Sequence, residues 1–306
     1  MGGDSRSSDP AAAGGCAEPR RFMEGGSDAA AGRPTPVMGA RELLAAYDQQ
    51  LRTDAEMVGA AAVVRLGPLS VGTFPGGRGF VTYAPPDRTA AEQLPALIPR
   101  VLDLFRPDPA ITQVEWKTRG HDEIPGLHEA LVAHGFEREA PESLMVGEAR
   151  MLAVDLPLPP GVQLRCIRGE ADVRAMVAMQ SQVFGSAVEE EDFVRFILGR
   201  QTRQDGMQLW VAEADGQIVS AGRIEPVAGT DFAGLWGGAT LPAWRRRGIY
   251  RALTAARARA ALAQGKTLIH SDSTEYSRPI LERSGLLKVS TTTPYRWSRL
   301  SGGASR

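Results

Sequence analysis

Three consecutive arginines followed by a glycine carry the clearest chemical signal in this chain. Arg245, Arg246 and Arg247 precede Gly248, and the chain then runs to Gln264 without glycine or proline. Apolar residues recur there at helical spacing, which predicts a helix that begins at Gly248. The start of a helix presents unpaired backbone N–H groups and a partial positive charge, and arginine can bind phosphate oxygens in bidentate fashion. These residue types in this order predict a cradle for a pyrophosphate group.

A short apolar stretch stands directly before the arginines. Residues 234–240 lead to Pro242, as a buried strand would. The order of strand, basic loop and helix resembles the acetyl-CoA signature of the GNAT N-acetyltransferases, R/Q-x-x-G-x-G/A. Arg245 stands at its first basic position, Gly248 at its first glycine, and Tyr250 where a second Gly or Ala is commoner. An ordinary helix start with a solvated basic face is the alternative interpretation.

The resemblance implies that acetyl-CoA is the cofactor. In this family the strand before the loop parts from its neighbour, and its unpaired backbone groups hold the pantetheine arm. The resemblance therefore places the following residues around the cofactor: Gly238, Ala239, Thr240, Arg245, Arg246, Arg247, Gly248, Ile249, Tyr250 and Arg251.

Acetyl transfer from a thioester to an amine needs a proton acceptor for the amine and a proton donor for the leaving thiolate, and it needs no covalent intermediate. Glu225, on the predicted strand before the cradle strand, is a candidate general base that acts through water. A solvated strand carboxylate is the alternative. Cys166 is interpreted as a small buried hydrophobe and not as a nucleophile.

The resemblance predicts a general-acid tyrosine four residues before a Gly-Phe pair. Leu281 occupies that place here, before the pair Gly-Leu at 285–286. Tyr276, one helical turn earlier, is the nearest substitute, and a surface or packing tyrosine is the alternative. Asp272 and Glu275 lie in the same predicted loop and could assist it.

The histidines and one acidic run admit two interpretations each. His270 lies in a predicted strand and is interpreted as a core histidine in preference to a catalyst. The three histidines of the first half lack metal-ligand spacing, so we expect no metal site. The acidic run at 189–192 falls where the family shapes its acceptor site, and it would attract a cationic amine. The same acids would also favour the start of a helix.

The composition excludes several classes of protein. The chain has 306 residues and a net charge of −1, which gives no global attraction to nucleic acid or to a membrane. Two cysteines are too few for a disulfide framework. The sequence has neither a membrane-span pattern nor the apolar core of a signal peptide. We therefore expect a cytoplasmic protein.

The order of predicted elements repeats along the chain. Residues 1–36, rich in Gly, Ala, Ser and Pro, are expected to be disordered. Strand, helix, Gly-apolar pair and strand occur in 38–150 and again in 162–300, with a proline-rich linker at 151–161. Residues 38–150 lack the R-x-x-G motif, which predicts a degenerate, non-catalytic copy. A mixed α/β cap without shared ancestry is the alternative.

Details of the first half follow from turn and capping residues. Strands are expected at 61–66 and 79–83, with turns at Gly72, Gly76 and Gly77 between them. Thr89 is the expected N-cap of the next helix, with Glu92 as its capping-box partner. Prolines 95 and 99 predict a kink in that helix.

The sequence thus predicts an α/β fold with a mixed central sheet flanked by helices, in two tandem GNAT-like domains. The predicted function is transfer of an acetyl group from acetyl-CoA to an amine of a small molecule or peptide. A non-catalytic acyl-CoA sensor or interaction module is the alternative, because the expected acid is missing at Leu281. We expect no nucleic acid and no membrane as partners, and a homodimer is left open.

Overall fold

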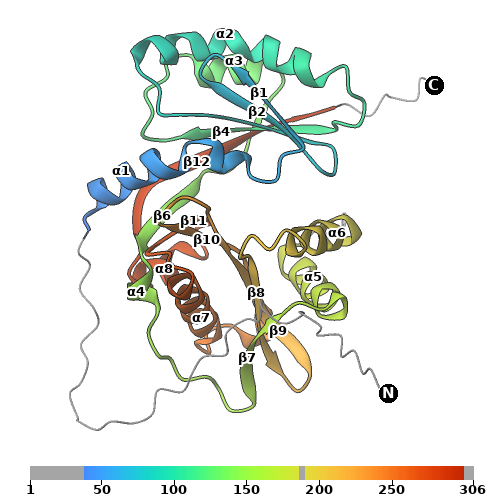
Figure 1. Cartoon of the computed structure of the whole chain (residues 1–306), viewed down its shortest axis with the longest axis vertical. Coiled ribbons are helices and arrows are strands. Elements are labelled where there is room, and N and C mark those ends of the chain that lie inside the picture. The colour runs from blue at the N-terminus through green and yellow to red at the C-terminus, as the bar shows by residue number, and fades with distance from the viewer. Residues whose placement is uncertain (1–37, 186–189, 300–306) are drawn as a thin grey trace, which may run out of the picture. The chain divides into compact units, whose positions relative to one another are not determined.

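The computed structural model describes residues 38–185 and 190–299. Its fold is α/β, with one mixed twelve-stranded sheet that carries helices on its faces (Figure 1). This confirms the predicted fold class. The expectation of disorder for residues 1–36 lies outside the described residues, as does Glu189.

The first half of the chain contains five strands and a short edge pairing, joined by helices. Its elements are α1 (Ala40–Leu51), η1 (Asp54–Met57), β1 (Ala62–Leu66), β2 (Leu69–Phe74), β3 (Arg78–Tyr83), α2 (Arg88–Phe105), β4 (Gln113–Arg119), α3 (Leu127–Ala133), β5 (Glu137–Arg138), β6 (Glu142–Glu148) and α4 (Ala149–Leu152).

The second half begins after the proline-rich segment. Its elements are β7 (Val162–Ile167), α5 (Glu170–Phe184), α6 (Glu190–Gln201), β8 (Gln208–Ala214), β9 (Gln217–Pro226), β10 (Phe232–Thr240), η2 (Pro242–Trp244), α7 (Ile249–Ala263), β11 (Leu268–Ser273), α8 (Arg278–Ser284) and β12 (Leu287–Ser298). The hairpin of β8 and β9 turns at Asp215 and Gly216, which both have positive φ.

One predicted turn is wrong. Gly72 lies inside strand β2 and not in a turn, because β2 pairs on both edges, with β1 and with β3. A Cβ atom at Gly72 would lie 2.8 Å from the Met57 sulfur, so the glycine allows the 3-10 helix to pack on the strand. The turn itself falls at Gly76 and Gly77, whose φ angles are +80° and +70°.

The predicted cap of α2 is also wrong. Asp87, and not Thr89, is the N-cap, and its carboxylate accepts a hydrogen bond from the Ala90 N–H at 2.8 Å. The helix continues past both prolines to Phe105 and buries an apolar face. The helix therefore begins two residues earlier than the capping-box pattern predicted.

The two halves exchange their closing strands. The strand order is β1-β2-β3-β4-β12-β6-β11-β10-β9-β8-β7, with β5 paired to β12. Strand β6 of the first half pairs along the whole of β11, while residues 292–298 of β12 pair with β4 of the first half. Neither half completes its part of the sheet with its own last strand. The division into domains at 38–150 and 162–300 stays a prediction.

A buried ion pair joins the halves near this exchange. The Lys117 ammonium on β4 lies 2.6 Å from the Asp272 carboxylate on β11, and Glu56 lies 3.8 Å from the same ammonium. Glu56 also binds Arg119, whose side chain is fully buried. Burial alone would raise the pKa of the Asp272 carboxyl, but the adjacent Lys117 charge holds that pKa below its usual range.

We predict that Asp272→Asn lowers the free energy of unfolding by about 3 kcal/mol, because it leaves Lys117 buried with only the more distant Glu56. Urea denaturation measures this. Glu92→Gln, which breaks an exposed pair with Arg88 on α2, is the control and should cost under about 0.5 kcal/mol. A loss for Asp272→Asn as small as that of the control would contradict the prediction.

The same pair predicts a pH dependence with a definite sign. A carboxyl with a lowered folded-state pKa stabilises the protein above its unfolded-state pKa of about 3.9, and this contribution disappears as the pH falls through the folded-state value. The difference between parent and Asp272→Asn should therefore be full at neutral pH and shrink below about pH 4.

Candidate functional site

Strand β10 separates from β11 after a short parallel pairing. The two strands pair only from Phe232 to Gly234 on β10, opposite residues 268–270. On the other edge, the register with β9 shifts between Trp236 and Ala239. The separation agrees with the parting strand that the sequence resemblance implied, and it opens the edge of β10 where Gly238 to Thr240 lie.

Side chains satisfy the carbonyl groups of the separated strand. The carbonyls of Leu235, Gly237, Ala239 and Thr240 accept hydrogen bonds from Ser271 (3.0 Å), Gln180 (2.6 Å), Ser220 (2.7 Å) and Arg245 (3.1 Å), respectively. Buried backbone acceptors are costly without a partner. These four carbonyls of the strand therefore have donors within the protein.

Gly237 is the turning point of the strand. Its φ is +60°, a conformation that favours glycine, and a Cβ atom there would lie 2.9 Å from Arg223 Nη1 and 3.0 Å from Gln180 Nε2. Gln180 projects from α5 on to this bulge. Neither Gln180 nor Gly237 stood out in the sequence, because no local pattern links a helix glutamine to a bulge 57 residues later.

The loop at residues 242–248, called the cradle loop below, connects β10 to α7. Arg246 and Gly248 both have positive φ, at +61° and +79°. Gly248 is the N-cap of α7 and offers no side-chain acceptor, and the first turn of the helix contains no acidic residue. The first N–H groups of α7 therefore point outward without a side-chain cap, beside exposed arginines.

The arginines of the cradle loop differ in their contacts. Arg245 donates to the Thr240 carbonyl, and the Arg247 guanidinium lies 4.8 Å from the centroid of the Trp244 ring. Arg246 is exposed. Ile249, in contrast, is buried in the hydrophobic core, so its side chain holds the helix in place and only its backbone faces the loop.

Tyr250 fills space beside the strand. A Cβ atom at Gly238 would lie 2.8 Å from the Tyr250 hydroxyl, so the ring packs directly against the strand backbone. The buried Arg257 guanidinium lies 5.9 Å from the Tyr250 ring centroid. The Gly or Ala that is commoner at this position would leave this space open. Tyr250 therefore distinguishes this chain from the usual pattern.

Glu225 lies on β9 and is engaged by two arginines. It stands opposite Gly234 in register, and its two oxygens bind Arg223 and, at 3.3 Å, Arg200. The side chain is 17% exposed. It is thus an ion-paired group beside the separated strand and not a freely solvated carboxylate. Its role as a base stays a prediction.

His270 faces the same position from β11. It also pairs with Gly234, and its ring centroid lies 5.4 Å from that of Trp236 and 5.9 Å from that of Phe232. Burial lowers the pKa of the His270 imidazole to about 4. The geometry is that of a neutral core histidine, the interpretation favoured from the sequence.

The predicted acid residues are not gathered at the strand. Tyr276 is 92% exposed, in the turn before α8, whereas Leu281 is buried. Asp272 is bound to Lys117, and Glu275 is bound to Arg278. The structure therefore leaves the Tyr276 hydroxyl in solvent, and its role stays a prediction.

The N-terminus of α2, the corresponding helix of the first half, is capped by a side chain. Asp87 caps α2 with its carboxylate, where Gly248 leaves the start of α7 uncapped. Strands β3 and β4 pair only as far as Val81 and Trp116. This contrast supports the interpretation of the first half as a copy without a phosphate cradle.

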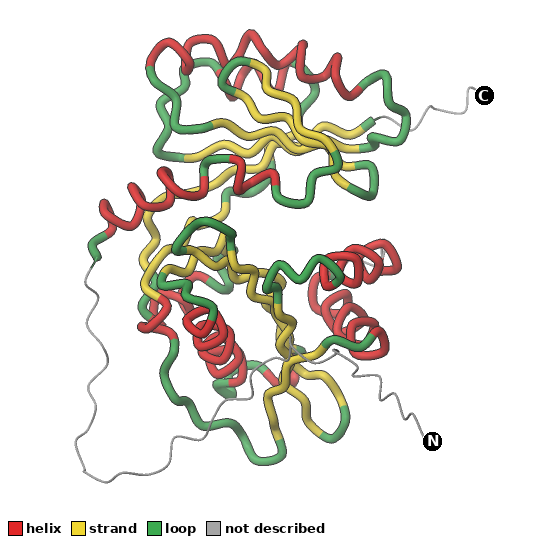
Figure 2. The backbone as a smooth tube through the Cα atoms, in the orientation of Figure 1, coloured by secondary structure: helices red, strands yellow, loops and turns green. Residues whose placement is uncertain are grey.

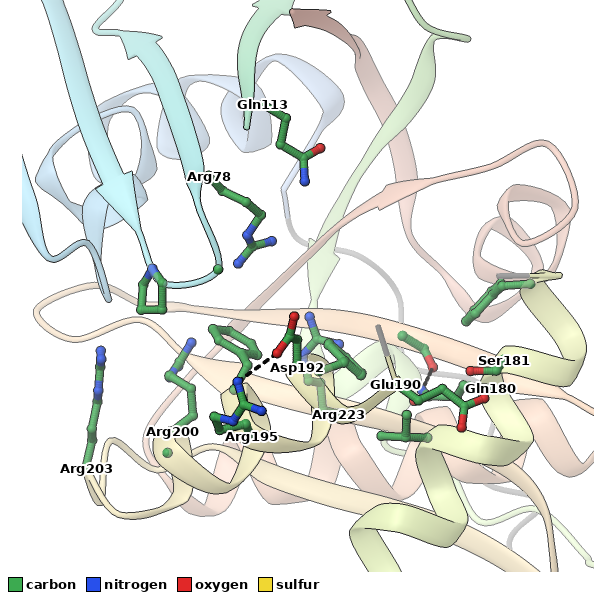
Figure 3. Close-up of a pocket in the computed structure, with 18 residues that line it drawn as sticks. Arg78, Gln113, Gln180, Ser181, Glu190, Asp192, Arg195, Arg200, Arg203 and Arg223 are labelled. Atoms are coloured by element: carbon green, nitrogen blue, oxygen red, sulfur yellow. Dashed lines mark hydrogen bonds and ion pairs between the residues drawn. The ribbon is translucent and has the colours of Figure 1, made fainter. Parts of the chain in front are cut away.

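A cavity of about 670 Å³ lies beside Gly237 (Figure 3). Its walls come from α5, α6, β9 and the β2–β3 turn of the first half. Adjacent residues of β9 show that this cavity and α7 lie on opposite faces of the sheet. A side chain at Gly222 would overlap Arg257 of α7, whereas Arg223 lies over Phe193 of α6. Figure 2 shows the two sets of helices on either side of these strands.

No helix in 38–185 or 190–299 is long and apolar enough to cross a membrane. Within the same ranges, no group of three or more His, Cys, Asp or Glu side chains could hold a metal ion.

The comparisons with known proteins agree with this geometry. Residues 157–271 match the family model described as the acetyltransferase (GNAT) domain. No curated protein matches the sequence.

Solved structures share the fold over most of the chain. A GCN5-related N-acetyltransferase from Kribbella flavida is 21% identical, with a TM-score of 0.59, over 84% of this chain and 94% of that one. A tandem GNAT protein from the clavulanic acid biosynthesis pathway is 14% identical, with a TM-score of 0.56, over 85% and 97%. A functionally unknown protein from Staphylococcus epidermidis is 13% identical, with a TM-score of 0.60, over 81% and 98%. At these identities the likeness shows the fold.

We predict that the His270 imidazole stays neutral down to about pH 4, because protonation would place a charge among buried rings. NMR titration of the histidine ring protons measures the midpoint, and the signal missing from a His270→Gln variant identifies the residue. Since the unfolded imidazole titrates near 6.5, protonation favours the unfolded state as the pH falls from 6.5 to 4. A midpoint near 6.5 in the folded protein would contradict the prediction.

Proposed function

With a GNAT domain at residues 157–271 and the GNAT fold over most of the chain, we propose that the protein transfers an acetyl group from acetyl-CoA to an amine. The observation that carries the proposal is the uncapped start of α7 beside a basic loop, at the end of a strand that has left its neighbour. Acyl transfer in general follows from the family. The acetyl donor, the amine and a cytoplasmic location are parts of the proposal.

The cradle loop suits a pyrophosphate. The N–H groups at the first turn of α7 donate to phosphate oxygens, and the exposed Arg246 and Arg247 supply charge that the helix start alone lacks. Gly248 has no Cβ atom and open space beside it, so the phosphates can approach the backbone. Arg251 adds a side chain whose Nε is buried and has no partner in the described chain.

The separated edge of β10 suits the pantetheine arm and the thioester. Because four carbonyls of the strand already accept hydrogen bonds from protein side chains, the arm would bind the other backbone groups of this edge. The bulge at Gly237 would bring its backbone to the carbonyl that becomes an oxyanion in the transition state, where fixed N–H donors lower the barrier.

Glu225 is proposed as the proton acceptor, and Tyr276 and solvent are the two candidate proton donors. Glu225 lies beside the separated strand and would accept the amine proton through water, while Arg200 and Arg223 hold the carboxylate in position. Tyr276 would need its turn to move inward before its hydroxyl could reach the thiolate, since it is now exposed. Solvent is the simpler proton source.

A non-catalytic acyl-CoA sensor is the second candidate. The observation that favours it is the buried Leu281 at the position where the family carries its acid. A measurement of turnover distinguishes the acetyltransferase from the sensor.

We predict that calorimetric titration of acetyl-CoA into the parent gives micromolar binding, which Gly248→Glu abolishes. The added carboxylate would stand where the pyrophosphate lies, in a repulsive position. Gly248→Ala is the matched control, because it carries the same backbone strain at φ +79° without a charge, and it should retain binding. No binding by the folded parent would remove the proposal.

We predict that Glu225→Gln lowers kcat by about 10²–10⁴-fold and leaves the affinity for acetyl-CoA unchanged. Thiol release with a panel of amines measures turnover. The control is Glu213→Gln on the neighbouring strand β8, which is likewise ion-paired, to Arg165. If acetyl-CoA binds but no amine is acetylated, the sensor is the better description.

A further inference from the structure

We propose that the cavity beside Gly237 binds an acceptor that carries an anionic group, a carboxylate or a phosphate, at the end remote from its amine. The inference deepens the proposed function, on which the position of the amine rests. The binding site for the anionic group rests on the residues of the cavity alone.

Five arginines line this cavity. Three of them bind carboxylates of the protein: Arg195 binds Asp192, Arg200 binds Asp205 and Glu225, and Arg223 binds Glu225. The other two, Arg78 and Arg203, have no ion-pair partner within the described parts of the chain. Arg78 and Arg203 therefore carry positive charge that no ion pair of the described chain neutralises.

Aromatic rings hold the guanidinium groups in place. Phe193 and Phe196 stack with centroids 6.1 Å apart. The Arg78 and Arg200 guanidinium carbons lie 5.7 Å and 6.0 Å from the centroid of the Phe196 ring. Arg200 is already paired with Asp205 and Glu225, whereas Arg78 is not, and the contact of Arg78 with the ring reduces the entropy lost when it binds an anion. Arg78 is thus oriented in advance toward an anion.

The first half of the chain supplies part of this site. Arg78 begins β3, directly after the turn at Gly76 and Gly77. Arg203 follows α6, and its guanidinium approaches Gly59 of the first half, since a Cβ atom there would lie 3.3 Å from Nη1. The first half, whose helix α2 has a capped N-terminus, thus contributes the anion-binding side chain of Arg78 to the cavity of the second half.

The cavity has two ends of different character. Gln180 donates to the Gly237 carbonyl. Figure 3 shows Glu190 beside Gln180, and Arg78 and Arg203 away from both. Glu190 has no ion-pair partner in the described chain and would attract an ammonium group. An amine would therefore be directed toward the separated strand while its anionic group meets the arginines.

The size of the cavity indicates a small molecule. About 670 Å³ falls within the range of pockets that enclose ligands of drug size. Attraction of a cationic amine was one of two interpretations of the acidic run at 189–192 in the sequence. The arginines change the expected class to an amine with an acidic group, because Asp192 is already bound to Arg195.

The test compares three matched series of amines of graded chain length: ω-amino carboxylates, the corresponding ω-amino carboxamides, and aminoalkyl phosphates. Acetylation is measured with the parent, Arg78→Gln, Arg203→Gln and the control Arg88→Gln, which removes a charge from a 93% exposed side chain on α2. Thermal unfolding checks that each variant is folded, as expected for exposed arginines.

The parent should have a KM at least about tenfold lower for the best carboxylate or phosphate than for its carboxamide. Arg78→Gln and Arg203→Gln should remove this preference by raising KM for the anionic amines, with little change in kcat, in KM for carboxamides or in acetyl-CoA affinity. Arg88→Gln should behave like the parent. The series with the lower KM identifies the anion. Equal KM values for all three series in the parent would overturn the inference.

A direct binding measurement separates this inference from the proposed function. The same three series are titrated calorimetrically into the protein without acetyl-CoA. If no amine is acetylated, binding of carboxylates or phosphates that is lost in Arg78→Gln still supports the anion site. If neither anionic series binds or reacts in preference to the carboxamides, the anion site is rejected, whatever acetyl-CoA does.

Discussion

The separation of β10 from β11 is the constraint on which the rest of this site depends. A strand that leaves its partner exposes backbone acceptors inside a protein, and each costs about 1–3 kcal/mol if it finds no donor. Ser271, Gln180, Ser220 and Arg245 supply those donors from β11, α5, β9 and the cradle loop. These hydrogen bonds fix the positions of α5 and of the cradle loop relative to the strand. The strand thereby aligns the start of α7, on one face of the sheet, with the arginine-lined cavity on the other face.

The two halves of the chain illustrate how a single residue changes the use of a helix start. Asp87 places a carboxylate at the start of α2, where it accepts a hydrogen bond from the Ala90 N–H and faces the positive end of the helix dipole. Gly248 supplies none. The first half has instead become part of the cavity wall through Arg78, and the ion pair between Lys117 and Asp272 fixes it to the second half.

Local features of the sequence predicted local features of the structure. The cradle loop, the helix after it and the hairpin at Asp215 and Gly216 follow from residue types at short spacing, and all lie where expected. The cavity could not be predicted in this way, since Arg78 and Phe196 are far apart in the sequence and meet only through the fold. The ion pairs of Glu225 could not be predicted from the sequence for the same reason. The exchange of β6 and β12 was also invisible, because strand periodicity indicates which face is buried and not which strand lies alongside.

The exchanged strands have a consequence for how the protein is made. Strand β4 ends at Arg119, but its neighbour β12 ends at Ser298, almost the last part of the described chain to be synthesised. At roughly 5–20 residues per second, the edge of β4 would wait on the order of ten seconds or longer on the ribosome for its partner. The first half therefore cannot finish folding as an independent unit during translation. A chain that lacked β12 would leave two incomplete sheets with open edges, which can pair with other chains and aggregate.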